Sequence, residues 1–321
     1  MNKDISIIIC TYNRCESLKE TLDSLCSQEH DGLFNYEVIV VDNNSTDKTK
    51  EVVEDYTERF NGRFRYALEP NQGLSNARNK GIKEAKGEII AFTDDDCIVD
   101  KKWLLNIYET YKKYEFDALG GRILPIYPEN TPQWIKDNND LLCGPIVFHD
   151  YGEDIKRHQN PMSEMIGANM AFRSKVFQEV GLFHPDLGAG KGTMGDETEL
   201  IRRLRKRQLK IYYCGKALVF HPIENERTNL EYIAKWNISY GRFEAKNLIL
   251  LSSKPLAYCF GAPRYLYREV IKNFLLLICS FYNRRSFLNY YMHFFRKIGM
   301  IKEFRKLSAC QTTTNPERSD G

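Results

Sequence analysis

The chain has 321 residues, of which 42% are hydrophobic and 28% are charged. This is the composition of an ordinary globular protein, and the length allows one large α/β domain with an appendage. The formal net charge of +3 is too small to indicate a nucleic-acid partner.

Cysteine usage and the N-terminus both favour a cytoplasmic protein. Nine cysteines are scattered without a CxxC pair, which fits neither a disulfide framework nor a zinc ribbon; they stand at positions 10, 15, 26, 97, 143, 214, 259, 279 and 310. We therefore expect reduced thiols. Met1 to Asp4 leads directly into a short strand, so we expect no cleavable signal peptide.

Residues 1 to about 125 alternate between apolar runs of strand length and segments of helical periodicity. Strands are predicted at 5–10, 36–41, 64–68 and 88–93, each followed by a helix. This alternation implies a largely parallel sheet with helices on both faces. In such sheets ligands bind beyond the carboxyl ends of the strands. The polar residues that follow the first, second and fourth strands are therefore expected to converge on one crevice.

Three consecutive acids, Asp94, Asp95 and Asp96, follow the fourth strand. Neighbouring like charges raise each other's pKa, so such a cluster is unfavourable without a counter-charge. Hard divalent ions such as Mg²⁺ or Mn²⁺ prefer carboxylate oxygens and would supply it. The alternative is a solvated acidic turn. The apolar strand fixes the position of the acids and favours a metal site.

Six short segments occur in a fixed order along the chain. They are Ile8–Arg14 (IICTYNR), Val40–Asp47 (VVDNNSTD), Asn71–Asn79 (NQGLSNARN), Thr93–Asp96 (TDDD), Gly167–Arg173 (GANMAFR) and Gly195–Leu200 (GDETEL). In order and spacing they resemble the family 2 glycosyltransferases, over about residues 4–245. The resemblance implies the GT-A nucleotide-diphospho-sugar transferase fold, an α/β fold with a mostly parallel sheet flanked by helices.

The resemblance also implies a metal site. Asp96 matches the direct ligand of the DXD motif, Asp94 is expected to face the ribose or the water shell of the metal, and Asp95 is grouped with the donor-binding residues. His221, in the segment VFHP after a strand, matches a histidine that completes the metal site in this family. A structural histidine is the alternative. The implied cofactor is Mn²⁺ or Mg²⁺, which neutralises the departing diphosphate as a Lewis acid.

Donor-binding residues follow from the same resemblance. Asp42 matches the carboxylate that accepts the N3–H of uracil, and Thr11 and Tyr12 are expected to line the base pocket. An Asx turn is the alternative role of Asp42, and the two roles are compatible. Arg78 is expected to reach the base or the phosphates. Arg14 is kept as a donor-binding candidate, although we expect its side chain to face solvent.

The catalytic base is expected within Asp196-Glu197. Inverting transfer needs a carboxylate that takes the proton of the acceptor hydroxyl. The family usually has Glu-Asp here and uses the second acid, whereas this chain has the two residue types in the opposite order. We favour Glu197 and keep Asp196 as the alternative. Both acids would also stabilise the N-terminus of the helix that follows.

The character of the sequence changes at about residue 228. Aromatic residues alternate with Lys and Arg from Pro263 to Leu307, and the longest uncharged run, Asn273 to Asn283, is shorter than the roughly 20 residues that a membrane span needs. Basic, aromatic, amphipathic helices commonly lie at a membrane interface. The alternative is a helical hairpin packed on the catalytic domain.

The predicted organisation has four parts. Residues 1–125 form the nucleotide-sugar-binding half of the GT-A domain, and 126–227 form the acceptor-side half with the base. Residues 228–310 form a helical, amphipathic region that associates with a membrane surface, and 311–321 form a disordered tail.

The function implied is that of a metal-dependent inverting hexosyltransferase. It would move a sugar from a nucleotide-diphospho-sugar, a UDP-sugar first, to a lipid-linked saccharide in surface polysaccharide biosynthesis, at the cytoplasmic face of the cell membrane. A sugar-nucleotidyltransferase and a non-catalytic GT-A module are the alternatives. A sugar-nucleotidyltransferase should have a glycine-rich basic loop after its first strand, and a non-catalytic module should have lost its acids. No GxGxxG follows Cys10, which disfavours a dinucleotide oxidoreductase.

Overall fold

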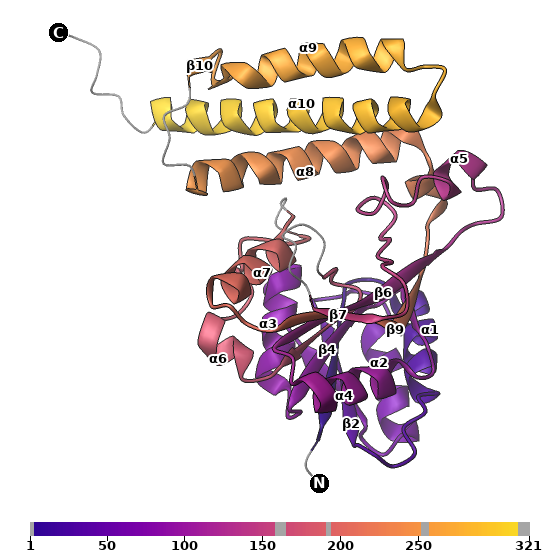
Figure 1. Cartoon of the computed structure of the whole chain (residues 1–321). Coiled ribbons are helices and arrows are strands. Elements are labelled where there is room, and N and C mark those ends of the chain that lie inside the picture. The colour runs from indigo at the N-terminus through magenta and orange to yellow at the C-terminus, as the bar shows by residue number, and fades with distance from the viewer. Residues whose placement is uncertain (1–2, 158–164, 191–193, 252–256, 314–321) are drawn as a thin grey trace. The chain divides into compact units, whose positions relative to one another are not determined.

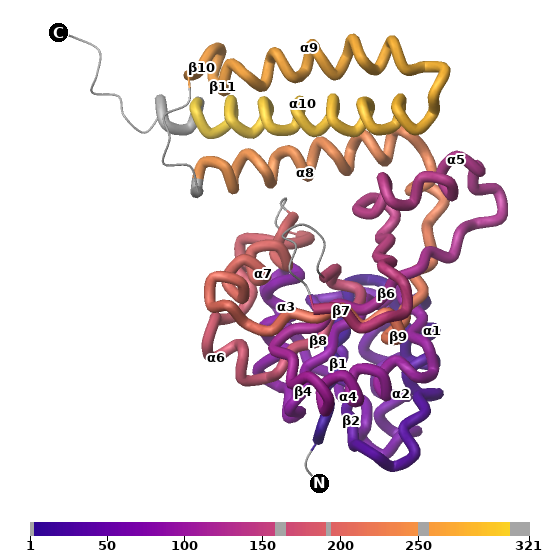
Figure 2. Tube along the Cα trace, in the orientation of Figure 1, coloured from indigo at the N-terminus to yellow at the C-terminus, as the bar shows by residue number. Residues whose placement is uncertain are grey.

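The computed structural model describes residues 3–157, 165–190, 194–251 and 257–313. The chain divides into two compact units. The first is drawn from Met1–Pro128, Val147–Lys191 and Gly195–Ile223, and the second from Glu129–Ile146, Gly192–Met194 and Glu224–Gly321. Figures 1 and 2 show the first unit as a sheet with helices on both faces and the second as a layer of long helices.

The first half of the sheet is parallel and confirms the predicted alternation. Its strands are β1 (Ile5–Thr11), β2 (Tyr36–Asp42), β3 (Phe64–Leu68) and β4 (Ile89–Asp94), in the order β3-β2-β1-β4. The helices that follow them are α1 (Cys15–Cys26), α2 (Thr49–Arg59), α3 (Leu74–Glu84) and α4 (Trp103–Tyr114). Each predicted strand lies within one residue of its observed bounds.

The second half of the sheet is mixed, and of it the sequence predicted the strand that leads to His221 and the helix after Asp196-Glu197 but not the pairing of the strands. Strand β8 (Met170–Arg173) is antiparallel to both β4 and β6 (Ala118–Ile126), and β6 is parallel to β9 (Ile211–Pro222). Two short strands, β5 (Ile98–Val99) and β7 (Ile155–Arg157), pair antiparallel with β9. Short helices α6 (Val176–Val180) and α7 (Asp196–Lys206) complete this half.

The two faces of the sheet bury separate apolar layers, because successive side chains of a strand point to opposite faces. Ile7 and Ile9 of β1 pack in the layer that contains Trp103 of α4, whereas Ile8 packs in the layer that contains Leu200 of α7. Burial on both faces explains why the central strands read as continuous apolar runs.

Asn169 joins three segments at an irregularity between β6 and β9. Its Oδ1 accepts a hydrogen bond from Trp103 Nε1 at 2.9 Å, and its Nδ2 donates to the carbonyl oxygens of Arg122 and Ala217, both at 2.8 Å. The pairing register shifts between Gly121 and Arg122. A Cβ at Gly121 would lie 2.2 Å from Asn169 Nδ2, so this position requires glycine.

The second unit is built from three long helices, as expected for the region after residue 228. They are α8 (Leu230–Leu251), α9 (Arg264–Cys279) and α10 (Arg284–Thr313), and α10 packs against the other two. The unit also contains α5 (Gln133–Lys136), the 3₁₀ turn η1 (Asn225–Thr228) and the short strands β10 (Tyr258–Cys259) and β11 (Ala262–Pro263). Of the expected tail, 311–313 belong to α10 and 314–321 lie outside the described residues.

Helices α8 and α10 approach each other closely at two glycines. A Cβ at Gly241 would lie 2.0 Å from the carbonyl oxygen of Arg296, and one at Gly299 would lie 2.1 Å from that of Ile238. Beside this crossing, the buried carboxylate of Glu303 accepts a hydrogen bond from Arg242 Nε at 2.9 Å. Within the described ranges, no helix combines the length and apolar character that crossing a bilayer requires.

Candidate active site

The ends of β1, β2 and β4 meet at one edge of the sheet, as predicted. Thr11 pairs with Asp42 across β1 and β2, and Cys10 pairs with Asp94 across β1 and β4. The polar residues that end these strands therefore face one region beyond the carboxyl edge.

A cluster of potential metal ligands lies at this edge. One ligand atom from each of Asp94, Asp96, Cys97 and His221 lies within 4.8 Å of all the others. His221 Nε2 is 3.6 Å from Asp96 Oδ1. His221 is the last residue but one of β9, so it lies within a strand and not after one as the sequence suggested. Cys97 was not predicted.

The chemistry of this donor set fits a hard divalent cation. Burial and the charge of Asp96 raise the pKa of Asp94 to about 7, which indicates a carboxylate without enough positive charge around it. Burial and the adjacent carboxylates also raise the pKa of the Cys97 thiol. A protonated thiol is a poor ligand, so Asp94, Asp96 and His221 remain as the residues that would hold Mn²⁺ or Mg²⁺.

Arg14 supplies part of the missing positive charge. Its side chain is 38% exposed, in partial agreement with the expectation that it faces solvent. Its Nη1 nevertheless contacts Asp96 Oδ2 and lies 3.5 Å from Asp95 Oδ1. Burial still raises the pKa of Asp95 to about 6. Arg14 is thus paired with Asp96, a member of the cluster that could hold a metal ion.

Asp42 is buried and holds the loop that follows β2. Its Oδ1 accepts the backbone N–H of Ser45 at 2.8 Å, and its Oδ2 accepts the hydroxyl of Tyr66 at 2.8 Å. Asp42 therefore has the turn-forming role that the sequence analysis gave as its alternative. Tyr66, on the neighbouring strand β3, was not predicted. Thr11 is buried beside Asp42, and Tyr12 is exposed.

Arg78 lies with the acid pair on α7. Its Nη1 contacts Asp196 Oδ2 and lies 3.1 Å from Glu197 Oε1, and its guanidinium stands 5.3 Å from the centre of the Phe183 ring. Burial disfavours the charged guanidinium, but the two carboxylates outweigh it and raise the pKa of Arg78. The sequence placed this residue at the base or the phosphates and gave no indication of its acidic partners.

The two acids of the pair differ in exposure and in pKa. The Asp196 side chain is 3% exposed and that of Glu197 is 24% exposed. Burial and the charge of Glu197 raise the pKa of Asp196. Burial also acts on Glu197, but Arg78 and a hydrogen bond from Asp196 hold the pKa of Glu197 below its ordinary value. Glu197 is therefore the more exposed acid of the pair and the one whose ionised form is favoured.

Glycines allow these charged groups to approach the backbone. A Cβ at Gly167 would lie 2.0 Å from Arg78 Nη2 and 2.5 Å from Glu197 Oε1. Gly188 has a φ of +97°, and a Cβ there would lie 3.2 Å from the carboxyl carbon of Asp196. Gly167 belongs to one of the six segments, and a side chain at this position would displace Arg78 or Glu197.

Residues 6–181 match the family model described as Glycosyl transferase family 2. That stretch is more than half of the chain. The chain belongs to glycosyltransferase family 2.

Similar proteins agree with this assignment. The glycosyltransferase is 25% identical over 235 residues to a glucosyl-dolichyl phosphate glucuronosyltransferase of Haloferax volcanii. The aligned residues cover 71% of this chain and 72% of the relative. Its fold is similar to that of the mannosyltransferase PcManGT from Pyrobaculum calidifontis, solved with GDP-Man and Mn²⁺ (TM-score 0.56, 16% identity, 100% of this chain and 77% of that chain). It is also similar to S. aureus TarS 1-349 in complex with UDP (TM-score 0.54, 16% identity, 99% of this chain and 94% of that chain). The GT-A fold is thereby confirmed.

Asn43 is a further residue that shapes the site of this glycosyltransferase. Its Oδ1 accepts the backbone N–H of Gly73 at 2.7 Å, and its Nδ2 donates to the carbonyl oxygens of Glu69 and Asn71 at 3.0 and 2.9 Å. It therefore fixes the loop that begins α3, the helix that carries Arg78. In the sequence, the feature that points to Asn43 is its position directly after Asp42 in one of the six segments.

Proposed function

We propose that this family 2 glycosyltransferase transfers a hexose from a UDP-sugar to a lipid-linked saccharide with inversion, assisted by Mn²⁺ or Mg²⁺. The observation that carries the proposal is the presence of two chemically different acidic groups at one edge of the sheet. One is the cluster of Asp94, Asp96 and His221. The other is the Arg78-bound pair of Asp196 and Glu197.

The two groups are close enough to interact electrostatically. The positive charge of Arg78 lowers the pKa of Asp94, and the negative charge of Glu197 raises it, although burial and Asp96 have larger effects. This closeness supports the proposal that a diphosphate held at the first group presents its sugar to the second. This supports the predicted division into a donor-binding half, residues 1–125, and an acceptor-side half, residues 126–227.

In the proposed reaction, Glu197 takes the proton of the acceptor hydroxyl as its oxygen bonds to the anomeric carbon. The bond from that carbon to the diphosphate oxygen breaks on the opposite face, and its electron pair leaves with the nucleoside diphosphate. A bound divalent cation would neutralise the charge that develops on the diphosphate. Arg78 orients Glu197 and keeps it ionised. In its protonated form, which its raised pKa favours, Asp196 donates a hydrogen bond to Glu197.

The choice of uridine rests on Asp42. An ionised carboxylate has about four lone-pair sites, and Ser45 and Tyr66 use two of those of Asp42. Acceptor capacity therefore remains for the N3–H of uracil. The TarS complex with UDP supports this choice, whereas the PcManGT complex with GDP-Man makes GDP-sugars the comparison to test.

The acceptor class rests on similarity. The Haloferax relative is named for a glucosyl-dolichyl phosphate, a lipid-linked saccharide. An acceptor of this kind would place the enzyme at the inner face of the cell membrane, with its helical region at residues 228–310 near the lipid.

Donor hydrolysis tests the proposed chemistry. Purified enzyme should hydrolyse a UDP-sugar slowly with Mn²⁺ and should not do so with a chelator. Asp96→Ala should lose both this activity and metal-dependent UDP binding, whereas Asp55→Ala on the surface of α2 should keep them. Equal activity in chelator would overturn the metal assignment, and a preference for GDP-sugars would overturn the uridine assignment.

A further inference from the structure

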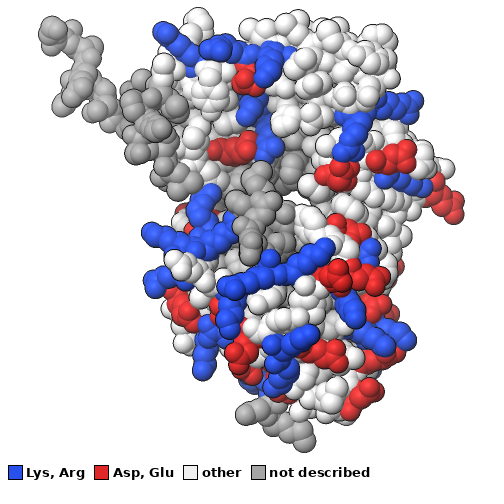
Figure 3. Space-filling model, viewed as in Figure 1, with Lys and Arg blue, Asp and Glu red and all other residues white. Residues whose placement is uncertain are grey.

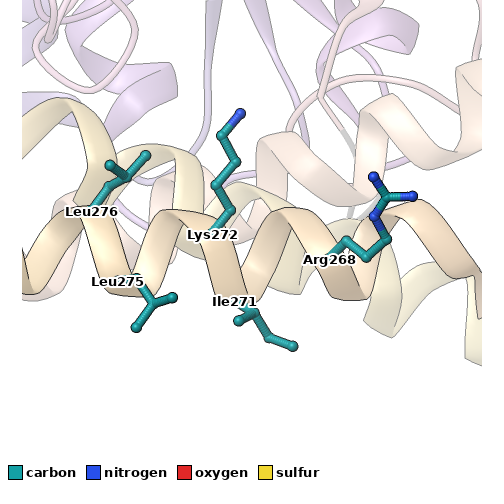
Figure 4. Close-up of a pocket in the computed structure, with 5 residues that line it drawn as sticks. All are labelled: Arg268, Ile271, Lys272, Leu275 and Leu276. Carbon is teal, nitrogen blue, oxygen red and sulfur yellow. The ribbon is translucent and has the colours of Figure 1, made fainter.

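Helix α9 of the second unit exposes apolar side chains to solvent. Ile271 is 61% exposed, and Phe274, Leu275 and Ile278 are about half exposed. The loop after the helix continues this surface with Phe281 and with Tyr282, which is 80% exposed. Figure 4 shows Ile271 and Leu275 one turn apart and pointing to the same side of the helix, beside a shallow hollow.

Basic side chains border these apolar residues. Arg264, Arg268 and Lys272 are all exposed on α9. The helix contains one acid, Glu269, whose carboxylate lies 4.0 Å from Lys272 Nζ. Figure 3 shows Lys and Arg beside an uncharged area on this part of the second unit. We call the surface formed by these residues the α9 face; it comprises Arg264, Arg268, Ile271, Lys272, Phe274, Leu275, Ile278, Phe281 and Tyr282.

Packing within the second unit leaves most of the α9 face exposed. Phe274 is the member that contacts α10, where its ring centre lies 5.7 Å from that of Phe294. Leu266 and Asn273 are the buried residues of α9, and this helix packs against α10. The exposed positions 264, 268, 271, 275 and 278 recur at intervals of three and four residues, so they form one stripe along the helix. None of the described helices is apolar enough to span a bilayer. The stripe is therefore suited to lie on an interface and not to cross it.

The charge of the α9 face distinguishes between a membrane and a second copy of the chain. In a two-fold symmetric dimer the same patch meets itself, so Arg264, Arg268 and Lys272 of both copies would be enclosed in one interface. Like charges brought together in this way are repulsive. An anionic bilayer offers an apolar layer beneath negatively charged headgroups, which matches both components of the face.

We propose that the α9 face docks on anionic lipid, with α9 parallel to the membrane surface. Ile271, Leu275 and Ile278 enter the boundary between headgroups and acyl chains, and Arg268 and Lys272 contact the headgroups. This inference deepens the proposed function, since a lipid-linked acceptor lies at the same surface. It names the residues that bring the enzyme there.

Vesicle flotation of the full-length protein tests the proposal. We expect it to float with vesicles of phosphatidylcholine and phosphatidylglycerol and to remain at the bottom with phosphatidylcholine alone. Arg268→Glu/Lys272→Glu should reduce the bound fraction at least about tenfold at low salt. Ile271→Ser/Leu275→Ser should reduce it similarly.

Two control variants change the same kinds of residues in the first unit. Lys112→Glu/Lys113→Glu reverses two exposed lysines of α4, and Leu33→Ser removes an exposed apolar side chain. Both should float like the unchanged protein. If the α9 variants float as well as these controls, or if the unchanged protein does not float, the proposal is wrong. Light scattering that finds a dimer disrupted by the α9 substitutions would assign the face to a second copy and also overturn it.

Donor hydrolysis separates this proposal from the proposed function. The α9 variants should hydrolyse the donor at the unchanged rate, which also shows that they are folded. Membrane binding without hydrolysis would contradict the proposed function alone. Hydrolysis without membrane binding would contradict the α9 proposal alone.

Discussion

Nη1 of Arg78 lies 3.1 Å from Oε1 of Glu197, although the two residues are on different helices, α3 and α7. The same nitrogen contacts Asp196. One buried cation therefore serves two carboxylates. The pKa of Asp196 is raised by burial and by the charge of Glu197, and Arg78 helps to hold that of Glu197 below its ordinary value, so Asp196 is the acid of the pair that is protonated first as the pH falls.

The assignment of the base gives the first prediction. Glu197→Gln keeps the shape of the side chain but removes the proton acceptor, so kcat should fall by roughly 10²–10⁴-fold. The Kd for the donor should change little, because the metal ligands are unaffected. Steady-state kinetics and equilibrium titration measure the two quantities. A larger fall of kcat in Asp196→Asn than in Glu197→Gln would assign the base to Asp196.

The second prediction concerns stability. Arg78→Met leaves the Asp196 and Glu197 carboxylates buried without their cation, which should cost about 3–5 kcal/mol at pH 8. Both acids would then have raised pKa values in the folded state, and protonation at pH 5.5 would restore part of the stability. Urea unfolding at the two pH values measures the difference.

A matched control for this variant is Lys80→Met, two residues along the same helix. Lys80 is partly exposed and pairs with Glu84 at 2.9 Å, a surface interaction worth at most about 1 kcal/mol. The loss of unfolding free energy in Lys80→Met should be small at both pH values. An Arg78→Met penalty that does not vary with pH would show that the two carboxylates are not its cause.

The third prediction concerns metal affinity and pH. Because burial and Asp96 raise the pKa of Asp94 to about 7, a proton competes with the metal for this carboxylate below that pH. Mn²⁺ should therefore bind more weakly at pH 6 than at pH 8, with proton release on binding. Calorimetry in buffers of different ionisation enthalpy measures both effects. In Asp94→Asn the released proton should be lost along with most of the affinity.

The fourth prediction tests the close approach at Gly167. Gly167→Ala would place a methyl group 2.0 Å from Arg78 Nη2, so the guanidinium and Glu197 must move. Turnover should fall at least about 100-fold, since small displacements of catalytic groups have effects of this size. Gly62→Ala is the comparison: its Cβ meets nothing within 4 Å, and the positive φ alone should cost about 1 kcal/mol without loss of turnover. Unchanged turnover in Gly167→Ala would show that the site tolerates the shift.

The part of the fold that local pattern determines was predicted well. Strands such as Ile5–Thr11 are buried on both faces and are apolar throughout, so they are visible in the sequence. Strand β6 contains Gly120 and Gly121 and a register shift, and its partner β9 lies far along the chain. Its pairing depends on tertiary contacts such as those of Asn169, which no local pattern reveals.

The same distinction applies to the site. The acids Asp94–Asp96, Asp196 and Glu197 were identified because their residue types and spacing resemble a known family. The contacts of Arg78 with α7 and of Arg14 with Asp96 were not identified, because each joins segments that are distant in sequence. A charged side chain in an amphipathic helix gives no sign of whether it faces water or a buried carboxylate.

Strand β9 contributes His221 to a cluster whose acids were synthesised much earlier in the chain. On the ribosome, the strands that carry Asp42 and Asp94 emerge well before α7 and β9. A growing chain thus acquires the proposed nucleotide-binding edge first and the proposed base Glu197 and His221 last. We therefore expect a chain released before β9 to cleave no sugar nucleotide, because it would lack His221.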